Sequence, residues 1–291
     1  MKRIKKAACC LLGVIVFSLP SVLNALETAP AARPDEEKTA EAARQPARQD
    51  RLADNFFGHE PVYFLVGPSP DHAKFQISFK YRLLNPKGSL ARHWQRLENI
   101  YFGYTQTSFW DWESDSAPFY DSSYKPELFY FRPDIPADNL SWLSRLSIQA
   151  GILHESNGKD GSDSRSLNMV YLKPGALVET GSRSHFTIEP CVWMYVGDLE
   201  DNPDIAEYRG YFDLEMAWEL RDSWKLSTVL RKGSGAGKGS VQFDATYPLV
   251  ELIGGNLDVY LQMQYYTGYA ETLLSYDERF DFVRIGLALF R

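Results

Sequence analysis

The fourteen residues YRGYFDLEMAWELR (208–221) decide the fold, because their side chains alternate between two chemical kinds. The first set is mainly apolar and consists of Tyr208, Gly210, Phe212, Leu214, Met216, Trp218 and Leu220. The second set carries the charges and consists of Arg209, Tyr211, Asp213, Glu215, Ala217, Glu219 and Arg221. Successive side chains of a β-strand point to opposite faces, so this stretch predicts a strand with one apolar and one charged face. Lipid on one side and a polar lumen on the other would account for both faces.

The same alternation recurs between about Pro61 and Arg291, where aromatic residues are dense. One further stretch sets Leu257, Val259, Leu261, Met263 and Tyr265 against Asp258, Tyr260, Gln262, Gln264 and Tyr266. Another sets Phe186, Ile188, Val192, Met194 and Val196 against Thr187, Glu189, Cys191, Trp193 and Tyr195. We count about twelve such strands, including a short one at Val62–Val66, and residues typical of turns separate them.

Strands that cross a membrane must close into a barrel, because an open sheet edge in hydrocarbon leaves backbone groups without partners. The chain has 17 Tyr and 7 Trp, as expected of aromatic girdles at two membrane interfaces. The sequence therefore predicts an all-β fold, a 12-stranded antiparallel transmembrane β-barrel over residues 56–291. A small antiparallel barrel in water is the alternative.

The first 25 residues have the form of a secretory signal peptide. Four positive charges precede an apolar run from Ala7 to Leu19, which is too short to span a membrane. Cleavage after Ala25 removes those four charges and no acidic residue, so the formal net charge changes from -7 to -11. A chain this acidic is a poor candidate for binding nucleic acid.

Residues 26–55 are rich in Ala, Arg, Glu, Asp and Pro and contain no aromatic residue, which predicts a disordered linker. Two of the three cysteines, Cys9 and Cys10, belong to the signal peptide. Cys191 would then be alone in the mature chain and could not form an internal disulfide, although export implies an oxidising compartment.

The segment HESNGKDGSDSRSLN (154–168) combines the residue types of a serine hydrolase. If its first residues form a strand, His154 and Ser156 project from the same side. The turn formers from Asn157 to Asp163 predict a hairpin loop, and a returning strand would bring Asn168 beside His154. The group then contains a nucleophile, a base and a neutral residue that orients the imidazole. A polar hairpin without catalytic function has the same spacing, so the spacing alone leaves both interpretations open.

The position of this segment on the predicted barrel favours chemistry at the lipid boundary. The strand face that carries Ile148 and Ile152 continues into His154 and Ser156, so these two side chains face lipid and not the lumen. On the returning strand, Asn168 shares a face with apolar residues. A polar trio on the outer wall near a strand end meets the membrane at headgroup depth, where a porin has no use for it.

These residues make the sequence resemble the outer membrane phospholipase A family of Gram-negative bacteria, from about Phe64 to the end. The most specific match is HESNG at 154–158, followed by SRSLN at 164–168. Further matches are YTQ (104–106), SAPF (116–119), YKPELF (124–129) and DNPDI (201–205). The resemblance implies an outer-membrane enzyme, a serine esterase of the phospholipase A1/A2 type. It also implies that the substrates are phospholipids and lysophospholipids, and that the active form is a calcium-bound homodimer.

Carried over by position, the resemblance implies that Ser156 is the nucleophile, His154 the general base and Asn168 the residue that orients His154. An uncharged orienting group suits a site at the lipid boundary, where a carboxylate would be costly to desolvate. The resemblance also implies that the backbone N–H of Gly158 is the oxyanion donor, and such preorganised dipoles usually supply a large share of catalysis in acyl transfer.

The cofactor implied by the resemblance is Ca2+, which prefers several oxygen ligands. The implied ligands are the Ser164 hydroxyl and the Lys159 carbonyl of one subunit and the Ser116 carbonyl of its neighbour. The family usually has Arg at position 159, but the ligand is a main-chain oxygen, so we expect the change to be tolerated. The carboxylates of Asp160 and Asp163 either bind calcium in the monomer or serve only as solvated turn formers.

Gln106 lies on a predicted strand whose outward positions include Phe102 and Tyr104. A glutamine that faces lipid needs a hydrogen-bond partner, and the resemblance implies that the interface of a reversible homodimer supplies it. The alternative is a side chain near the membrane edge that reaches water.

Two other classes of function remain open from the sequence. A passive porin would explain the barrel and leave the outward trio unexplained. A catalytically silent scaffold or adhesin barrel would keep the fold, but the intact Ser156, His154 and Asn168 argue against it.

Overall fold

The structure is a computed structural model that describes residues 53–67, 73–86, 93–111, 119–137, 143–254 and 257–291. The predicted signal peptide and nearly all of the predicted linker lie outside these residues. Asp54–Arg291 form one compact unit. Asn55, the last residue of the predicted linker, is buried, and its carbonyl oxygen accepts a hydrogen bond of 2.8 Å from the Arg82 N–H.

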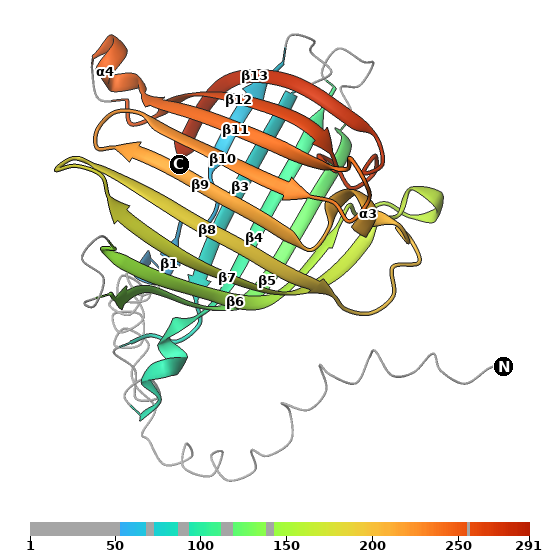
Figure 1. The fold of residues 1–291 in the computed structure, drawn as a ribbon, viewed down its shortest axis with the longest axis horizontal. Coiled ribbons are helices and arrows are strands. Elements are labelled where there is room, and N and C mark those ends of the chain that lie inside the picture. Colours follow the sequence, from blue (N-terminus) through green and yellow to red (C-terminus); the bar gives the residue numbers. More distant parts are fainter. Residues whose placement is uncertain (1–52, 68–72, 87–92, 112–118, 138–142, 255–256) are drawn as a thin grey trace, which may run out of the picture. The chain divides into compact units, whose positions relative to one another are not determined.

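The described residues form thirteen β-strands in one sheet (Figure 1). They are β1 (Phe56–Phe57), β2 (Val62–Val66), β3 (Ala73–Arg82), β4 (Ile100–Trp110), β5 (Phe119–Pro136), β6 (Arg145–Ser156), β7 (Ser166–Glu179), β8 (Ser184–Tyr195), β9 (Phe212–Leu220), β10 (Lys225–Lys232), β11 (Gly239–Pro248), β12 (Tyr260–Tyr269) and β13 (Arg279–Phe290).

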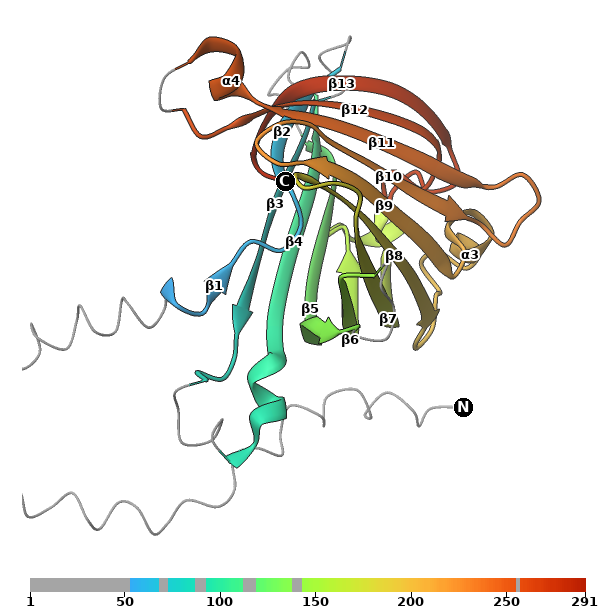
Figure 2. The same cartoon turned by 60° about the vertical axis from the view of Figure 1, so that its left-hand side comes forward.

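Each strand from β2 to β12 pairs antiparallel with the next one, and β13 pairs antiparallel with β2, so twelve strands close a ring (Figure 2). The two-residue β1 pairs with β3 at Tyr81 and Lys80, beyond the residues of β3 that pair with β2. The predicted all-β, 12-stranded antiparallel barrel is therefore confirmed.

The two faces of this barrel differ in chemistry in the way a membrane requires. Register places Leu128, Ile152, Val170 and Met194 side by side on four adjacent strands, and all four side chains are exposed on the outer wall. The inward side chains that are buried are polar or charged on most strands: Lys74, Ser78, Thr105, Thr107, Ser123, Glu127, Glu155, Asp244, Gln262, Gln264 and Arg284. A barrel in water would place its apolar residues inside, so this distribution fits lipid outside and a polar lumen.

The stretch that predicted the fold is shorter as a strand than its alternation indicates. Tyr208 and Arg209 belong to the short helix α3 (Ile205–Arg209), and β9 begins only at Phe212. Gly210 causes the difference, because its φ of +67° ends the helix in a conformation that side chains other than glycine rarely adopt. In the same way β12 begins at Tyr260, three residues after the alternation starts at Leu257.

The direction of the strands places two groups of connections at opposite ends of the barrel. One end carries the β6–β7 loop and α3, and the other carries α4 (Leu249–Ile253) and the end of β13 (Figure 1). The described residues also include two 3-10 turns, Gln95–Asn99 and Gly161–Asp163.

Among the described residues, no helix combines the length and apolar character needed to cross a membrane.

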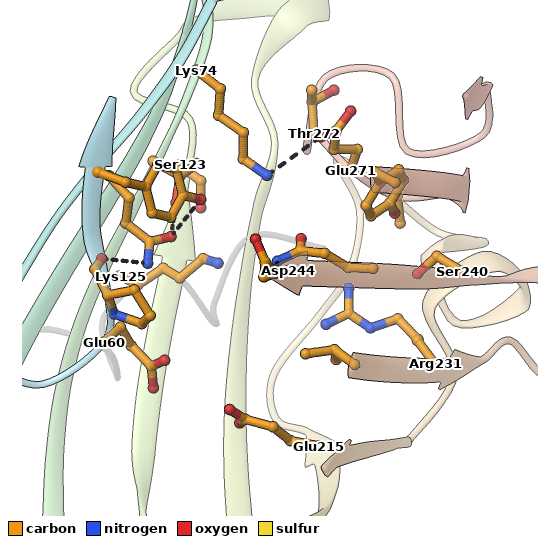
Figure 3. A pocket seen from close by; sticks show the side chains of 18 of the residues that line it. Glu60, Lys74, Ser123, Lys125, Glu215, Arg231, Ser240, Asp244, Glu271 and Thr272 are labelled. Carbon is orange, nitrogen blue, oxygen red and sulfur yellow. Dashed lines mark hydrogen bonds and ion pairs between the residues drawn. The ribbon is translucent and has the colours of Figure 1, made fainter. Parts of the chain in front are cut away.

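The lumen contains a polar chamber of about 230 Å³ whose walls carry charges of both signs. Figure 3 shows Ser123 and Lys125 on one side of it and Asp244, Arg231 and Glu271 on the other. Lys74 donates to Gln264 Oε1 (2.9 Å) and forms an ion pair with Glu271 (3.3 Å). Arg284 forms an ion pair with the same Glu271 carboxylate (2.5 Å). Buried charges therefore connect β3, β12, β13 and the β12–β13 connection inside the lumen.

Candidate active site

The predicted catalytic residues lie on the hairpin formed by β6 and β7. The two strands pair from Arg145↔Leu177 to Ser156↔Ser166, and this register sets His154 directly opposite Asn168. Residues 157–165 form the loop between them. The hairpin expected from the turn formers is therefore present, and it holds His154 and Asn168 on paired strands.

His154 and Asn168 contact each other through their side chains. Nδ1 of His154 lies 2.9 Å from Oδ1 of Asn168. A carbonyl oxygen accepts and does not donate, so Nδ1 carries the proton and Nε2 remains as the basic nitrogen. This is the arrangement that a neutral orienting residue needs.

Ser156 shares the outer face of β6 with His154. The two residues are two positions apart, which is roughly 7 Å along a strand. Glu155, the residue between them, is buried on the lumen side. The structure thus brings the nucleophile and base candidates to the outer wall, as the alternation predicted.

An apolar groove runs along the outer wall beside these residues. His154 and Asn168 line it, together with Phe102, Pro126, Leu128, Ile152, Val170 and Val196. Its walls come from β4, β5, β6 and β7 and from Val196, the residue after β8. A groove of this kind can hold an acyl chain next to the polar pair.

The loop after Ser156 is held in shape by the buried side chain of Asn157. Its Oδ1 accepts hydrogen bonds from the backbone N–H groups of Arg165 (3.0 Å) and Lys159 (3.3 Å). Its Nδ2 donates to the backbone carbonyl of Asp163 (2.8 Å). Gly158 has a φ of +70°, which favours glycine at the predicted oxyanion position.

The predicted calcium ligands are only partly placed. The Ser164 hydroxyl donates to Oδ2 of Asp201 at 3.0 Å, and Lys159 directs its ammonium group to the carbonyl of Tyr120 at 2.5 Å. Asp160 and Asp163 are exposed in the loop. Ser116 lies outside the described residues. No three His, Cys, Asp or Glu side chains converge on a common point within the part of the chain that the structure describes.

The DNPDI motif (201–205), to which the sequence assigned no role, lies against this loop. Besides the Asp201–Ser164 contact, Oδ1 of Asn202 accepts a hydrogen bond from the Ser166 N–H (3.1 Å). The Tyr276 hydroxyl donates to Asp204. Burial and this bond to a carboxylate raise the pKa of Tyr276 well above its ordinary value, so the phenol stays protonated and holds the motif.

Gln106 has hydrogen-bond partners within its own strand. Its Oε1 accepts from the Tyr104 hydroxyl (3.0 Å), and its Nε2 donates to Ser108 Oγ (3.1 Å). Tyr104, Gln106 and Ser108 are alternate residues of β4, so they share one face and can bond along it. The expectation that the amide must find its partner in a second subunit is therefore weakened, and its part in a dimer interface stays a prediction.

Comparison with known proteins shows the family of this chain. The family model described as Phospholipase A1 matches residues 38–289. The chain belongs to the phospholipase A1 family. A relative from Neisseria meningitidis serogroup B is 34% identical over 222 residues, which are 74% of this chain and 53% of that protein, so the match spans about half of that relative's length. The phospholipase A1 of Escherichia coli is 31% identical over 226 residues, 75% of this chain and 69% of that protein.

Solved structures show the same fold. The outer membrane phospholipase A from Escherichia coli has a TM-score of 0.65 and 26% identity, covering 80% of this chain and 98% of that one. The outer membrane phospholipase dimer of Salmonella typhi, with bound calcium, has a TM-score of 0.65 and 25% identity, covering 80% and 91%. A structure of the Escherichia coli protein with an active-site asparagine changed to alanine has a TM-score of 0.64 and 25% identity, with the same coverage. Family membership makes this chain an ester hydrolase by class.

Proposed function

We propose that this chain is a calcium-dependent outer-membrane serine esterase of the phospholipase A1/A2 type. Its substrates would be phospholipids and lysophospholipids, and pairing with a second copy would activate it. The observation that carries the proposal is the His154–Asn168 hydrogen bond on the outer wall, beside an apolar groove. An esterase for lipids needs its catalytic groups on the surface that lipid reaches.

In this proposal Ser156 Oγ attacks the ester carbonyl of a lipid whose acyl chain lies in the groove. His154 Nε2 takes the hydroxyl proton and then passes it to the departing alcohol oxygen. The acyl group is now on Ser156, and His154 activates a water that releases it as a fatty acid. Asn168 keeps Nδ1 protonated throughout, so Nε2 is the nitrogen that carries the proton in both steps.

The tetrahedral intermediate carries a negative oxygen, which we assign to the backbone N–H of Gly158. The preceding Asn157 supports this role, because three hydrogen bonds to the loop backbone fix its side chain. A donor that is already oriented does not have to reorganise as charge develops. The asparagine named in the Escherichia coli active-site mutant supports a role for Asn168 as the orienting residue.

The donors around the β6–β7 loop fit a calcium ion, since they are all oxygens. The Ser164 hydroxyl, the Asp201 carboxylate beside it and the Lys159 carbonyl would hold the ion, and Asp160 and Asp163 would add negative charge near it. A similar structure, the Salmonella typhi dimer, carries calcium. When bound, the ion would supply positive charge that stabilises the developing oxyanion.

A second copy of the chain would complete the site. The groove beside His154 is open to lipid along its outer side, and another apolar wall would enclose an acyl chain. The Ser116 carbonyl of the neighbour and a contact at Gln106 are the proposed contributions of that wall. Export through the predicted signal peptide would bring the chain to the outer membrane.

The decisive test is release of fatty acid from phospholipid in detergent micelles, with and without calcium. We expect release only with calcium, and we expect Ser156→Ala to lower turnover by roughly 10³-fold or more, because removing a nucleophile leaves only binding and oxyanion effects. Ser227→Ala, which removes a lumen hydroxyl on β10, serves as the control and should keep full activity. A sulfonyl fluoride should label Ser156. Label on another serine, or an active Ser156→Ala variant, would overturn the assignment.

A further inference from the structure

Glu155 is the residue between the proposed base His154 and the proposed nucleophile Ser156. It lies on β6 between His154 and Ser156 and points to the opposite side of the wall. The residue is only 3% exposed. A β-strand couples neighbouring residues rigidly, so a force on the Glu155 side chain acts directly on the backbone that carries the other two.

The Glu155 carboxylate is held by two other elements. Ser123 of β5 donates its hydroxyl to Oε1 at 2.7 Å. Arg209, the last residue of α3, forms an ion pair with Oε2 at 2.7 Å. Lys125 of β5 adds a weaker ion pair at 3.7 Å. Both Glu155 and Arg209 are buried at the chamber wall, where low polarity strengthens the attraction between opposite charges.

The segment 201–209, which ends with α3 and Arg209, also contacts β7 and the β6–β7 loop. Asp201 accepts the Ser164 hydroxyl, and Asn202 accepts the Ser166 N–H. Residues 201–209 thus contact the end of β6 from inside through Arg209, the first residue of β7 through Asn202, and the loop between these strands through Asp201. Ile205, between these contacts, is fully buried and fixes α3 in the apolar cluster at this end of the barrel.

We infer that Glu155 and Arg209 are positioning residues for the esterase reaction. The ion pair fixes the end of β6 from the lumen side, and in this way it sets where Ser156 and His154 stand on the outer wall. The inference rests on the proposed function, because it assigns a role to groups behind the proposed nucleophile. It adds an inner support to the outer His154–Asn168 contact.

The test compares purified, refolded variants in the micelle assay, with activity normalised to the fraction that shows the heat-modified gel mobility of a folded barrel. Glu155→Gln keeps the shape and the bond to Ser123 but leaves Arg209 unpaired. We expect kcat to fall roughly 10- to 100-fold, the size of effect that small misplacements of catalytic groups produce, with KM within about twofold. Labelling of Ser156 by a sulfonyl fluoride should slow by a similar factor.

Glu271→Gln is the matched control. It removes a carboxylate that is as deeply buried in the lumen and also pairs with two cations, Lys74 and Arg284 on β3 and β13. Folded Glu271→Gln protein should keep wild-type kcat and labelling rate. If folded Glu155→Gln matches it in both measurements, the inference is wrong.

Substitutions of Arg209, the ion-pair partner of Glu155, give a second test that can be carried out even if Glu155→Gln does not fold. Arg209→Gln should lower kcat, and Arg209→Lys should retain more activity because a cation still faces Glu155. The double variant Glu155→Gln with Arg209→Gln should be at least as active as the less active of the two single variants, because the two residues act as a unit. Losses that multiply would contradict a shared role. Ser156→Ala separates the two hypotheses: if it is active, the proposed function fails, and if it is inactive while both pair variants are normal, only this inference fails.

Discussion

The imidazole Nδ1 of His154 and the amide Oδ1 of Asn168 lie 2.9 Å apart on directly opposed positions of β6 and β7. The contact is built on two paired strands, so its geometry does not depend on the loop that joins them. Sites on regular elements hold their side chains more accurately than sites on loops. The proposed oxyanion donor Gly158 and the proposed calcium ligands Lys159 and Ser164 lie on the loop instead.

The first prediction concerns that contact. Asn168→Ala removes the acceptor and frees the imidazole to rotate or change tautomer. We expect kcat to fall about 10- to 100-fold with little change in KM, because one hydrogen bond of about 1–3 kcal/mol is lost in the orientation of the base. Asn168→Asp keeps an acceptor at the same position and should retain more activity than Asn168→Ala. Steady-state kinetics in micelles check this, and an unimpaired Asn168→Ala enzyme would contradict it.

The second prediction concerns calcium. Excess chelator should abolish hydrolysis without altering the heat-modified gel mobility, since the ion is proposed to bind a loop and the strands carry the stability. Asp201→Asn should raise the calcium concentration for half-maximal activity by about tenfold, a usual result of weakening a metal's surroundings. Asp222→Asn, in an exposed turn at the opposite end, is the control and should leave it unchanged. Full activity in excess chelator would rule out the calcium role.

The third prediction concerns dimerisation. Gln106→Ala should weaken calcium-driven crosslinking by about fivefold, because polar contacts between membrane segments contribute only about 1 kcal/mol. The loss of crosslinking should also be small because Gln106 already forms hydrogen bonds with Tyr104 and Ser108 of its own strand. Activity should fall at low enzyme density and recover at high density. Equal specific activity at dilutions that leave only monomers would refute activation by dimerisation.

The fourth prediction separates the enzyme from a porin. The lumen holds buried charged and amide side chains such as Lys74, Gln264 and Arg284, which bond to one another or to Glu271 inside it. Purified protein in planar bilayers should therefore show no large, stable conductance. Ser156→Ala should behave identically, because the serine lies on the outer wall. Large steady pores in either sample would favour the porin alternative.

Much of the fold follows from the sequence because period-two alternation is a local property. In YRGYFDLEMAWELR, each side chain of the strand is apolar or polar according to the face it occupies, so the pattern indicates the inside and the outside of the wall. The same local rule placed His154, Ser156 and Asn168 on the lipid side. Turn formers between them indicated the hairpin, and hairpin pairing then set His154 opposite Asn168.

The tertiary structure alone decided which inward side chains meet. Lys74 and Glu271 are 197 residues apart and form an ion pair, and Arg209 at the end of α3 forms an ion pair with Glu155 of β6. Alternation predicts whether a side chain points into the lumen or out of the barrel. It does not predict which inward side chains from distant segments come into contact. Closure, register and the path of the loops determine that neighbour, and they depend on contacts between segments distant in sequence. For this reason the outward positions of His154 and Asn168 could be predicted from the chain, whereas the ion pair between Glu155 and Arg209 could not.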